Sequence, residues 1–348
     1  MTVRIISLGF AVPPNSYSQE EVFQVLNYPR HFQRLFRDTG ITKRHFWVPL
    51  SVIRELSWQQ QQEEYLKGAV STSLAAIRNC LDAFSPTEVG CVVFGSCTGF
   101  APGPTIPHLL AKELGFLPNT YYTNIASMGC ESGFPGLKRA FDYVCTTGGI
   151  ALVVNCELAS CTYFPEEDGK ADSENDYELL RSNAIFSDAA SAALVGVEEK
   201  PDWHHPIIED METYTNPEYS GDLGFTWRDG RLRVLLSKRV PVLAPEVTKP
   251  AIEAVLRRNG LEVSDITWFV IHAAGNKVLD NIRDALGIPE EKMKLTRSTL
   301  RDYGNTSSTS VGITGKRLMS ENIKQGDYIL MVSVGPGMTG GATLLRFS

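Results

Sequence analysis

The sequence predicts an α/β protein built from two duplicated halves, and three observations support this fold class. Apolar, strand-like runs alternate with helical segments along most of the 348 residues, which is typical of parallel α/β sheets. The same order of elements occurs twice. Polar residues follow these elements at matching places, since Ser96 and Cys130 are 34 positions apart and His272 and Asn305 are 33 apart. We therefore divide the chain into a first half, 1–197, and a second half, 198–348.

The first half is predicted to open with a buried strand, RIISLGFA, and a short helix, SQEEVFQVL, with Ser18 as its N-cap. A long helix is expected between residues 58 and 84. The elements that follow are the strand CVVFGSCTG, the helix PTIPHLLAKELGF, the segment YYTNIASMGC, a helix beginning at Cys130 and the strand GGIALVVNCE. Phe134, Leu137, Phe141 and Val144 share one face of the helix that begins at Cys130.

The second half repeats this order after residues 198–245, a segment rich in Pro, Trp and short polar runs that we interpret as a bridging insertion. Its predicted elements are the helix PAIEAVLRRNG, the strand ITWFVIHAAG, the helix NKVLDNIRDALGI, the segment MKLTRSTLRDYGN, the helix TSVGITGKRLMSENI and the strand GDYILMVSVG. A duplicated unit of this kind favours two halves packed together, with equivalent turns facing one cleft.

Composition excludes several classes of function. The 33 Lys and Arg residues against 40 Asp and Glu give a net charge of −7, which argues against a nucleic-acid partner. No apolar run has the length of a membrane span, so no membrane partner is expected. The seven irregularly spaced Cys residues fit a reducing cytoplasm, and without a CxxC pair we expect no metal site.

Three polar residues occupy positions suited to chemistry, because ligand sites in α/β proteins lie where strands end. Cys130 stands at a helix N-terminus, where unpaired N–H groups favour a thiolate. His272 ends a strand and is placed to form a thiolate–imidazolium pair. Asn305 is placed to donate to a carbonyl oxygen that becomes negative. Taken singly, they read as a small core residue, a structural His and a helix cap; their matching places in the repeat favour catalysis.

The third member of this set indicates the type of reaction. A hydrolase would want an acidic partner to orient its His, and no such Asp or Glu stands out in the sequence. A neutral Asn instead suits carbon–carbon bond formation, in which decarboxylation of a malonyl thioester leaves an enolate that two donors stabilise.

The motifs SCTGFAPG, SMGCESG, AIFSDAASAALVG, IHAAGNKVLDNIRDALGI, STLRDYGNTSSTSV and VGPGMTGGATLLRF agree in order and spacing with one family. The chain resembles the type III polyketide synthases, the chalcone synthase-like branch of the thiolase superfamily. The resemblance implies a thiolase-like fold, with the two halves packed as a five-layered αβαβα core. It also implies a homodimer that uses acyl-CoA and malonyl-CoA and needs no cofactor. By resemblance, Cys130 carries the acyl chain, while His272 and Asn305 drive decarboxylation.

The resemblance also assigns residues that bind substrate. Phe186 matches an aromatic gatekeeper between the CoA tunnel and the cavity, and Val234 stands at the second gatekeeper position. The positions that line the family's cavity hold Cys97, Thr98, Thr162 and Ser307. A basic run, Arg34, Arg37, Lys43 and Arg44, falls near the family's tunnel, and from it we select Arg34 and Arg37 as contacts of CoA phosphate; a solvated helix face is the alternative.

Two other functions remain open at this stage. The first is a ketoacyl carrier protein synthase III-like enzyme that performs one condensation, although the usual His-Gln-Ala-Asn run is replaced by HAAG from His272 to Gly275. The second, from a different class, is an inactive scaffold subunit with a thiolase fold. The sequence does not determine the starter acyl group, the number of extensions or the mode of ring closure.

Overall fold

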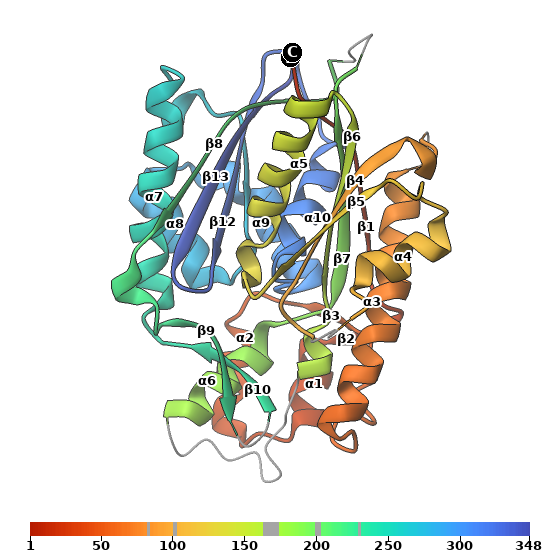
Figure 1. Ribbon diagram of the computed structural model, residues 1–348. Coiled ribbons are helices and arrows are strands. Elements are labelled where there is room, and N and C mark those ends of the chain that lie inside the picture. Colours follow the sequence, from red (N-terminus) through yellow and green to blue (C-terminus); the bar gives the residue numbers. More distant parts are fainter. Residues whose placement is uncertain (82–83, 100–102, 163–173, 199–202, 229–230) are drawn as a thin grey trace.

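The computed structural model of this chain is an α/β protein in which helices pack on both faces of a central sheet (Figure 1). It describes all residues except 82–83, 100–102, 163–173, 199–202 and 229–230. In Figure 1, α7 and α8 form one outer layer and α3 and α4 the other. The two arms of the sheet lie inside these layers, with α5 and α10 between the arms. The five predicted layers are therefore present.

A nine-stranded mixed sheet forms both β layers. In spatial order its strands are β11 (Trp268–Ile271), β12 (Tyr328–Gly335), β13 (Thr339–Arg346), β8 (Ile207–Thr215), β1 (Arg4–Ala11), β7 (Ala189–Gly196), β6 (Ile150–Glu157), β4 (Val89–Ser96) and β5 (Tyr121–Ala126). The halves meet where Arg4 of β1 pairs with Ile207 of β8. Two ribbons complete the described strands, β2 (Asn15–Ser18) with β3 (Lys43–Phe46), and β9 (Leu223–Arg228) with β10 (Arg231–Leu236).

The helices cover the faces of this sheet. The first half contains α1 (Gln19–Leu26), α2 (Gln33–Arg37), α3 (Trp58–Cys80), α4 (Ile106–Leu114), α5 (Gly133–Thr147) and α6 (Glu174–Ile185). The second contains α7 (Val240–Arg258), α8 (Asn276–Leu286), α9 (Glu290–Tyr303) and α10 (Thr309–Leu318). Ser18 caps α1 as predicted, because its hydroxyl accepts from the Glu21 N–H while the Glu21 carboxylate accepts from the Ser18 N–H.

The predicted internal repeat is visible in the strand pairing. In the first half β4 is parallel to β6, and β6, β7 and β1 then pair antiparallel. In the second half β11 is parallel to β12, and β12, β13 and β8 then pair antiparallel. One element differs: β5 (Tyr121–Ala126) is aromatic and β-branched, whereas the matching segment of the second half forms α9. Buried Met293 and Leu300 lie seven positions apart in α9, which is a helical spacing.

The interpretation of residues 198–245 as a bridging insertion is wrong in part. Ile207–Thr215 forms β8, a strand of the central sheet that pairs along β13. The sequence IIEDMETYT conceals this role because most of its side chains are only half-buried or exposed. Its position depends on backbone pairing with β13 and not on an apolar pattern. The remainder of the segment supplies the β9–β10 ribbon and the start of α7.

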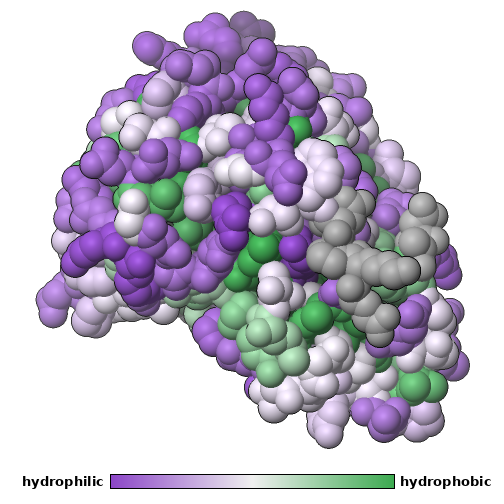
Figure 2. All heavy atoms as spheres, turned by 90° about the horizontal axis from the view of Figure 1, so that it is seen from above, coloured by the Kyte–Doolittle hydropathy of each residue, from purple (hydrophilic) through white to green (hydrophobic). Residues whose placement is uncertain are grey.

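The surface agrees with the charged composition. Seen from above in Figure 2, hydrophilic residues cover most of the face, and hydrophobic residues appear only in small groups. Within the part of the chain that the structure describes, no helix has both the length and the apolar character needed to cross a membrane.

Candidate active site

Cys130 lies in a tight turn between β5 and α5. A 3₁₀ turn, Gly129–Glu131, holds it, and α5 begins at Gly133. Gly129 has φ of 56°, and a Cβ there would lie 2.2 Å from Cγ of Pro336, in the turn between β12 and β13. A side chain at this position would be strained by the positive φ and would collide with Pro336. Glycine therefore lets the turn between β12 and β13 pack against the turn that carries Cys130.

The thiol of Cys130 is buried, with 9% of the residue exposed. Its Sγ accepts a hydrogen bond from Ser307 Oγ at 3.3 Å. Burial raises the pKa of Cys130 to about 12, and the negative charge of Glu157 contributes to the increase. Cys130 is therefore a thiol at neutral pH in the resting protein, although its turn precedes a helix as predicted.

Asn305 follows α9 and is held in a fixed orientation by its neighbours. Its Oδ1 accepts the Ser307 N–H at 2.9 Å, and its Nδ2 donates to the Ala274 carbonyl at 3.1 Å. Its backbone also forms an isolated β-bridge with Phe186. An amide nitrogen has two hydrogens, and only one is used among the described residues. Asn305 can therefore offer the second to a substrate carbonyl.

His272 directly follows β11 and is 1% exposed. Burial lowers its pKa to about 4, so the imidazole is neutral at neutral pH. Its Nδ1 lies 2.7 Å from Ser310 Oγ on α10. Among the described residues it makes no hydrogen bond with Cys130. The predicted thiolate–imidazolium pair is therefore not the resting state, because burial favours the neutral form of both groups.

Glu157, which ends β6, is a residue of this site that was not predicted from the sequence. Its buried carboxylate accepts from the Cys97 N–H at 3.1 Å, Thr98 Oγ1 at 3.0 Å and Ser308 Oγ at 2.7 Å. Ser307 Oγ lies 3.4 Å from the same carboxylate, so it stands between Glu157 and Cys130. Burial raises the pKa of Glu157 against the effect of these donors. The sequence feature that could have identified Glu157 is its position as an acidic residue at the end of the apolar strand GGIALVVNCE.

One cavity, with about 390 Å³ of empty space, brings the predicted substrate-binding residues together. It is lined by seven of the residues selected from the sequence, namely Cys97, Thr98, Cys130, Thr162, Phe186, Val234 and Ser307. Leu223, Gly224, Phe225 and Pro336 also line it and were not predicted. His272 and Asn305 are not among its lining residues. Asn305 contacts Ser307 directly, and its Ala274 partner is two residues from His272.

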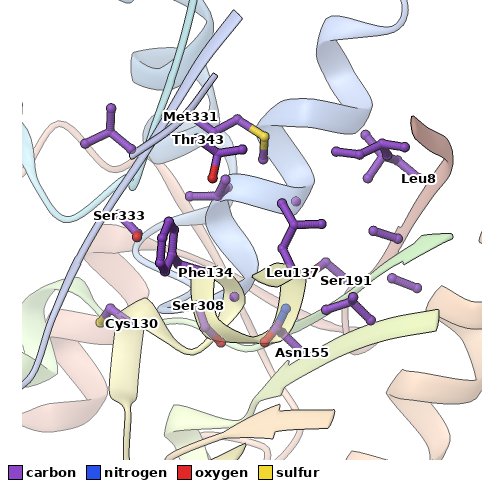
Figure 3. A pocket seen from close by; sticks show the side chains of 18 residues that line it. Leu8, Cys130, Phe134, Leu137, Asn155, Ser191, Ser308, Met331, Ser333 and Thr343 are labelled. Atoms are coloured by element: carbon purple, nitrogen blue, oxygen red, sulfur yellow. The ribbon is translucent and has the colours of Figure 1, made fainter. Parts of the chain in front are cut away.

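A second cavity, with about 640 Å³ of empty space, lies between α5 and α10 (Figure 3). Its lining is mainly apolar and includes Leu8, Phe134 and Leu137. Cys130 stands at its edge, and Figure 3 shows the sulfur turned away from Leu8 and Leu137. We therefore assign the thiol to the smaller cavity, which its hydrogen-bond partner Ser307 also lines.

The predicted basic run separates into exposed and buried residues. The side chains of Arg34 and Arg37 are 80% and 76% exposed, and Asp38 lies 3.0 Å and 3.8 Å from them. Arg44 is fully buried, so its place in a CoA-steering cluster is wrong. Its Nη1 donates to the carbonyls of Asn183 and Phe186 at 2.6 Å and 3.1 Å. Arg44 thus helps to fix the backbone of the predicted gatekeeper.

Glu131 directly follows the nucleophile but has a different environment. It is buried, and Thr213 Oγ1 of β8 lies 3.4 Å from its Oε1. Burial raises the pKa of Glu131 to about 8. Glu131 is not among the groups that shift the pKa of Cys130, although it is the next residue in the chain.

Glu157 and Glu131 allow a controlled test of what raises the pKa of Cys130. Glu157→Gln removes a negative charge that raises the pKa of Cys130, so that pKa should fall. At a fixed pH well below 12, alkylation by iodoacetamide should then accelerate about tenfold for each unit by which the pKa falls. Glu131→Gln should leave the rate unchanged.

The measurement is mass spectrometry of the Cys130 peptide between pH 7 and 10, which separates it from the exposed Cys145. Gln fits at position 157 because its oxygen can face the Cys97 N–H while its nitrogen faces the hydroxyls of Ser307 and Ser308, which can turn to accept. Equal rates in the two variants would show that Glu157 does not control the thiol.

Known proteins are similar to this chain over nearly its whole length. Residues 256–347 match the family model described as 3-oxoacyl-[acyl-carrier-protein (ACP)] synthase III C terminal. The chain is 28% identical to 1,3,6,8-tetrahydroxynaphthalene synthase of Streptomyces coelicolor, over 96% of this chain and 89% of that protein. It is 26% identical to 3,5-dihydroxyphenylacetyl-CoA synthase of Streptomyces toyocaensis, over 99% of this chain and 90% of that protein.

A solved structure matches over the whole length. The crystal structure of the Streptomyces coelicolor tetrahydroxynaphthalene synthase, a bacterial type III polyketide synthase, superposes with a TM-score of 0.88 at 24% identity and covers 99% of each chain. The fold and the relatives together define an acyltransferase of the thiolase-like class. Within this class, the predicted resemblance to type III polyketide synthases is confirmed.

Proposed function

We propose that this protein loads an acyl group from a CoA thioester on Cys130, extends it with malonyl-CoA and releases an aromatic or pyrone polyketide. The observation that supports this most strongly is the cavity that joins Cys130 to Phe186, Val234 and Ser307, with Asn305 hydrogen-bonded to Ser307. A thiol, a neutral imidazole and an oriented amide suit acyl transfer and decarboxylation together.

Loading exchanges one thioester for another. Cys130 Sγ forms a bond to the acyl carbon, the bond from that carbon to the CoA sulfur breaks, and the Cys130 proton ends on the released CoA thiol. Because burial raises the pKa of Cys130, the thiol has to lose its proton during the reaction. Ser307 Oγ, 3.3 Å from Sγ, is placed to stabilise the developing thiolate.

Extension begins with loss of CO₂ from malonyl-CoA. The C–C bond to the carboxylate breaks, and its electron pair forms an enolate whose charge rests on the thioester oxygen. Two neutral donors, the Asn305 amide and the His272 imidazole, stabilise that oxygen. The enolate carbon then attacks the acyl carbon on Cys130, and the Cys130 thiolate leaves.

Two alternatives have less support. The synthase III model matches only residues 256–347, whereas the relatives that match nearly the whole chain are named polyketide synthases. A scaffold subunit would not need Cys130, Ser307 and Asn305 linked by hydrogen bonds beside a cavity.

The experiment that tests the proposal is incubation of purified protein with malonyl-CoA and a panel of acyl-CoA starters. We expect CO₂ release and product masses that rise by whole acetyl units. A single ketoacyl product from every starter would indicate the synthase III-like function. No turnover and no acyl-enzyme with any starter would favour the scaffold.

We also place this protein in the cytoplasm as a homodimer that needs no cofactor besides its CoA substrates. The edge strand β5, with Tyr121 67% exposed, offers backbone groups to a second copy. A monomer in equilibrium sedimentation at micromolar concentration would contradict the dimer. Loss of activity in EDTA, restored by a metal ion, would contradict the absence of a cofactor.

Arg34 and Arg37 remain our prediction for steering CoA to a protein with a net charge of −7. The double variant Arg34→Ala/Arg37→Ala should raise KM for malonyl-CoA and leave kcat nearly unchanged. Salt should weaken binding by the wild type more than by the variant, since it screens exposed charges. Arg257→Ala/Arg258→Ala, at the end of α7, is a charge-matched control. Equal KM values for wild type and the Arg34/Arg37 variant at low salt would place the tunnel entrance elsewhere.

A further inference from the structure

A buried serine on α10 contacts the imidazole of His272. Ser310 is fully buried, and its Oγ lies 2.7 Å from His272 Nδ1. The same oxygen accepts the N–H of Ala273 at 3.3 Å. These are its only two side-chain hydrogen bonds among the described residues. The hydroxyl on α10 is therefore joined to the end of β11, where His272 and Ala273 lie.

The contact with His272 has two possible directions, because a serine hydroxyl can donate one hydrogen bond and accept two. If Nδ1 carried the imidazole proton, Ser310 Oγ would accept from both His272 and Ala273. The hydroxyl proton would then have no acceptor among the described residues. A buried donor without a partner is unfavourable, because it has lost its hydrogen bonds with water and gained none in the protein. If the hydroxyl donates to Nδ1, Ser310, Ala273 and Nδ1 all have partners, and the Nε2–H of His272 is the one polar group of the cluster without a partner among the described residues.

The second direction determines the tautomer of His272. Burial keeps this imidazole neutral at neutral pH, so it carries one proton. With Nδ1 accepting from Ser310, that proton lies on Nε2. Nε2 makes no hydrogen bond among the described residues, so it can donate to a substrate oxygen.

We propose that Ser310 is a positioning residue that holds His272 as the Nε2–H tautomer, so that the imidazole is a donor to the thioester oxygen during malonyl decarboxylation. The catalytic half of this inference rests on the proposed function. The tautomer itself does not. Among the described residues, the Ser310 side chain forms no hydrogen bond with Cys130 or with a residue that lines the smaller cavity, so its hydroxyl acts on the reaction through His272.

The first test is the tautomer of the wild-type protein. Nitrogen NMR of protein labelled with ¹⁵N-histidine distinguishes Nε2–H from Nδ1–H, and the His272→Gln variant assigns the signal among the six His residues. We expect Nε2–H near neutral pH. A wild-type spectrum with the proton on Nδ1 overturns the proposal whatever any variant does.

The second test compares Ser310→Ala with Thr314→Val. Thr314 lies one turn further along α10, is also fully buried, and donates its hydroxyl to the Ser310 carbonyl at 2.8 Å. Both variants lose one buried hydroxyl, and only Ser310→Ala loses the contact with His272. Ser310→Ala should show a mixture of tautomers and a fall of about 10- to 100-fold in kcat for decarboxylation, by analogy with residues that orient a metal-binding His. Its KM should change little.

A rescue variant separates this role from simple packing. Ser310→Thr keeps the hydroxyl and should retain the Nε2–H signal and most of the wild-type rate. Ser310→Ala with a pure Nε2–H signal, or with the kcat of Thr314→Val, overturns the proposal. If the wild type decarboxylates no CoA thioester, the proposed function fails, and the NMR result still decides the role of Ser310.

Discussion

Cys130→Ala should abolish covalent acyl loading and leave the fold intact. Deleting one small thiol removes little buried surface, and among the residues that the structure describes, its one hydrogen bond with another side chain is the one from Ser307. The other thiol that lines the cavity, Cys97, donates to the Glu157 carboxylate, and we expect it not to replace Cys130 in forming the thioester that the extension step needs. Incubation with an acyl-CoA followed by intact-protein mass spectrometry should show the acyl adduct in the wild type and none in the variant.

The control for this experiment is Cys145→Ala. Cys145 lies on α5, the helix that follows Cys130, and it is exposed. This variant removes a thiol that is more exposed to solvent than Cys130. It should still form the acyl adduct on Cys130. Malonyl-CoA decarboxylation should persist at a reduced rate in Cys130→Ala, since His272 and Asn305 remain. An acyl adduct on the Cys130→Ala protein would show that another residue is the nucleophile.

His272→Ala and Asn305→Ala should each slow malonyl-CoA decarboxylation by about 10²–10³-fold, the usual loss when one oxyanion donor is removed. Both residues are neutral donors in the resting protein, so their contribution depends on orientation and not on charge. Asn305 is oriented by Ser307 N–H and the Ala274 carbonyl, and His272 by Ser310. The measurement is CO₂ release at saturating malonyl-CoA.

Two further variants sharpen this prediction. Asn281→Ala, which removes an amide that donates to the Pro241 carbonyl on the outer layer, should leave the rate unchanged. His272→Gln keeps a neutral donor and should lose less activity than His272→Ala. If CO₂ release by Asn305→Ala equals that of Asn281→Ala, the amide does not touch the developing negative charge.

The protonation of the site would also set its pH dependence. Burial lowers the pKa of His272 to about 4, so the imidazole should remain neutral over the physiological range. Burial raises the pKa of Cys130 to about 12, so thiolate should become more abundant with every unit of pH up to that value. Loading should therefore become faster with rising pH, whereas decarboxylation should not follow the titration of either group near neutrality.

Much of this architecture was available from the sequence because it depends on local patterns. The duplicated order of strands and helices predicted the two arms of the sheet, and the Ser18 cap follows from one short motif. The equivalent turns located Cys130, His272 and Asn305, and the family resemblance selected the residues that line the cavity. Strand β8 was missed because its side chains show no apolar alternation and its place depends on pairing with β13.

Only the tertiary structure decided the electrostatic state of the site. Glu157 ends a strand far from residues 305–310 in the chain, and only folding places its carboxylate against Ser307 and Ser308. A local motif placed Cys130 at a helix start, which favours thiolate, but the surroundings exclude water and reverse that preference. Likewise Arg44 belongs to a basic run in the sequence and is fully buried in the fold. Burial and long-range hydrogen bonds arise only when the helices and strands pack together. The sequence could therefore predict which side chains react, but not whether those side chains are charged.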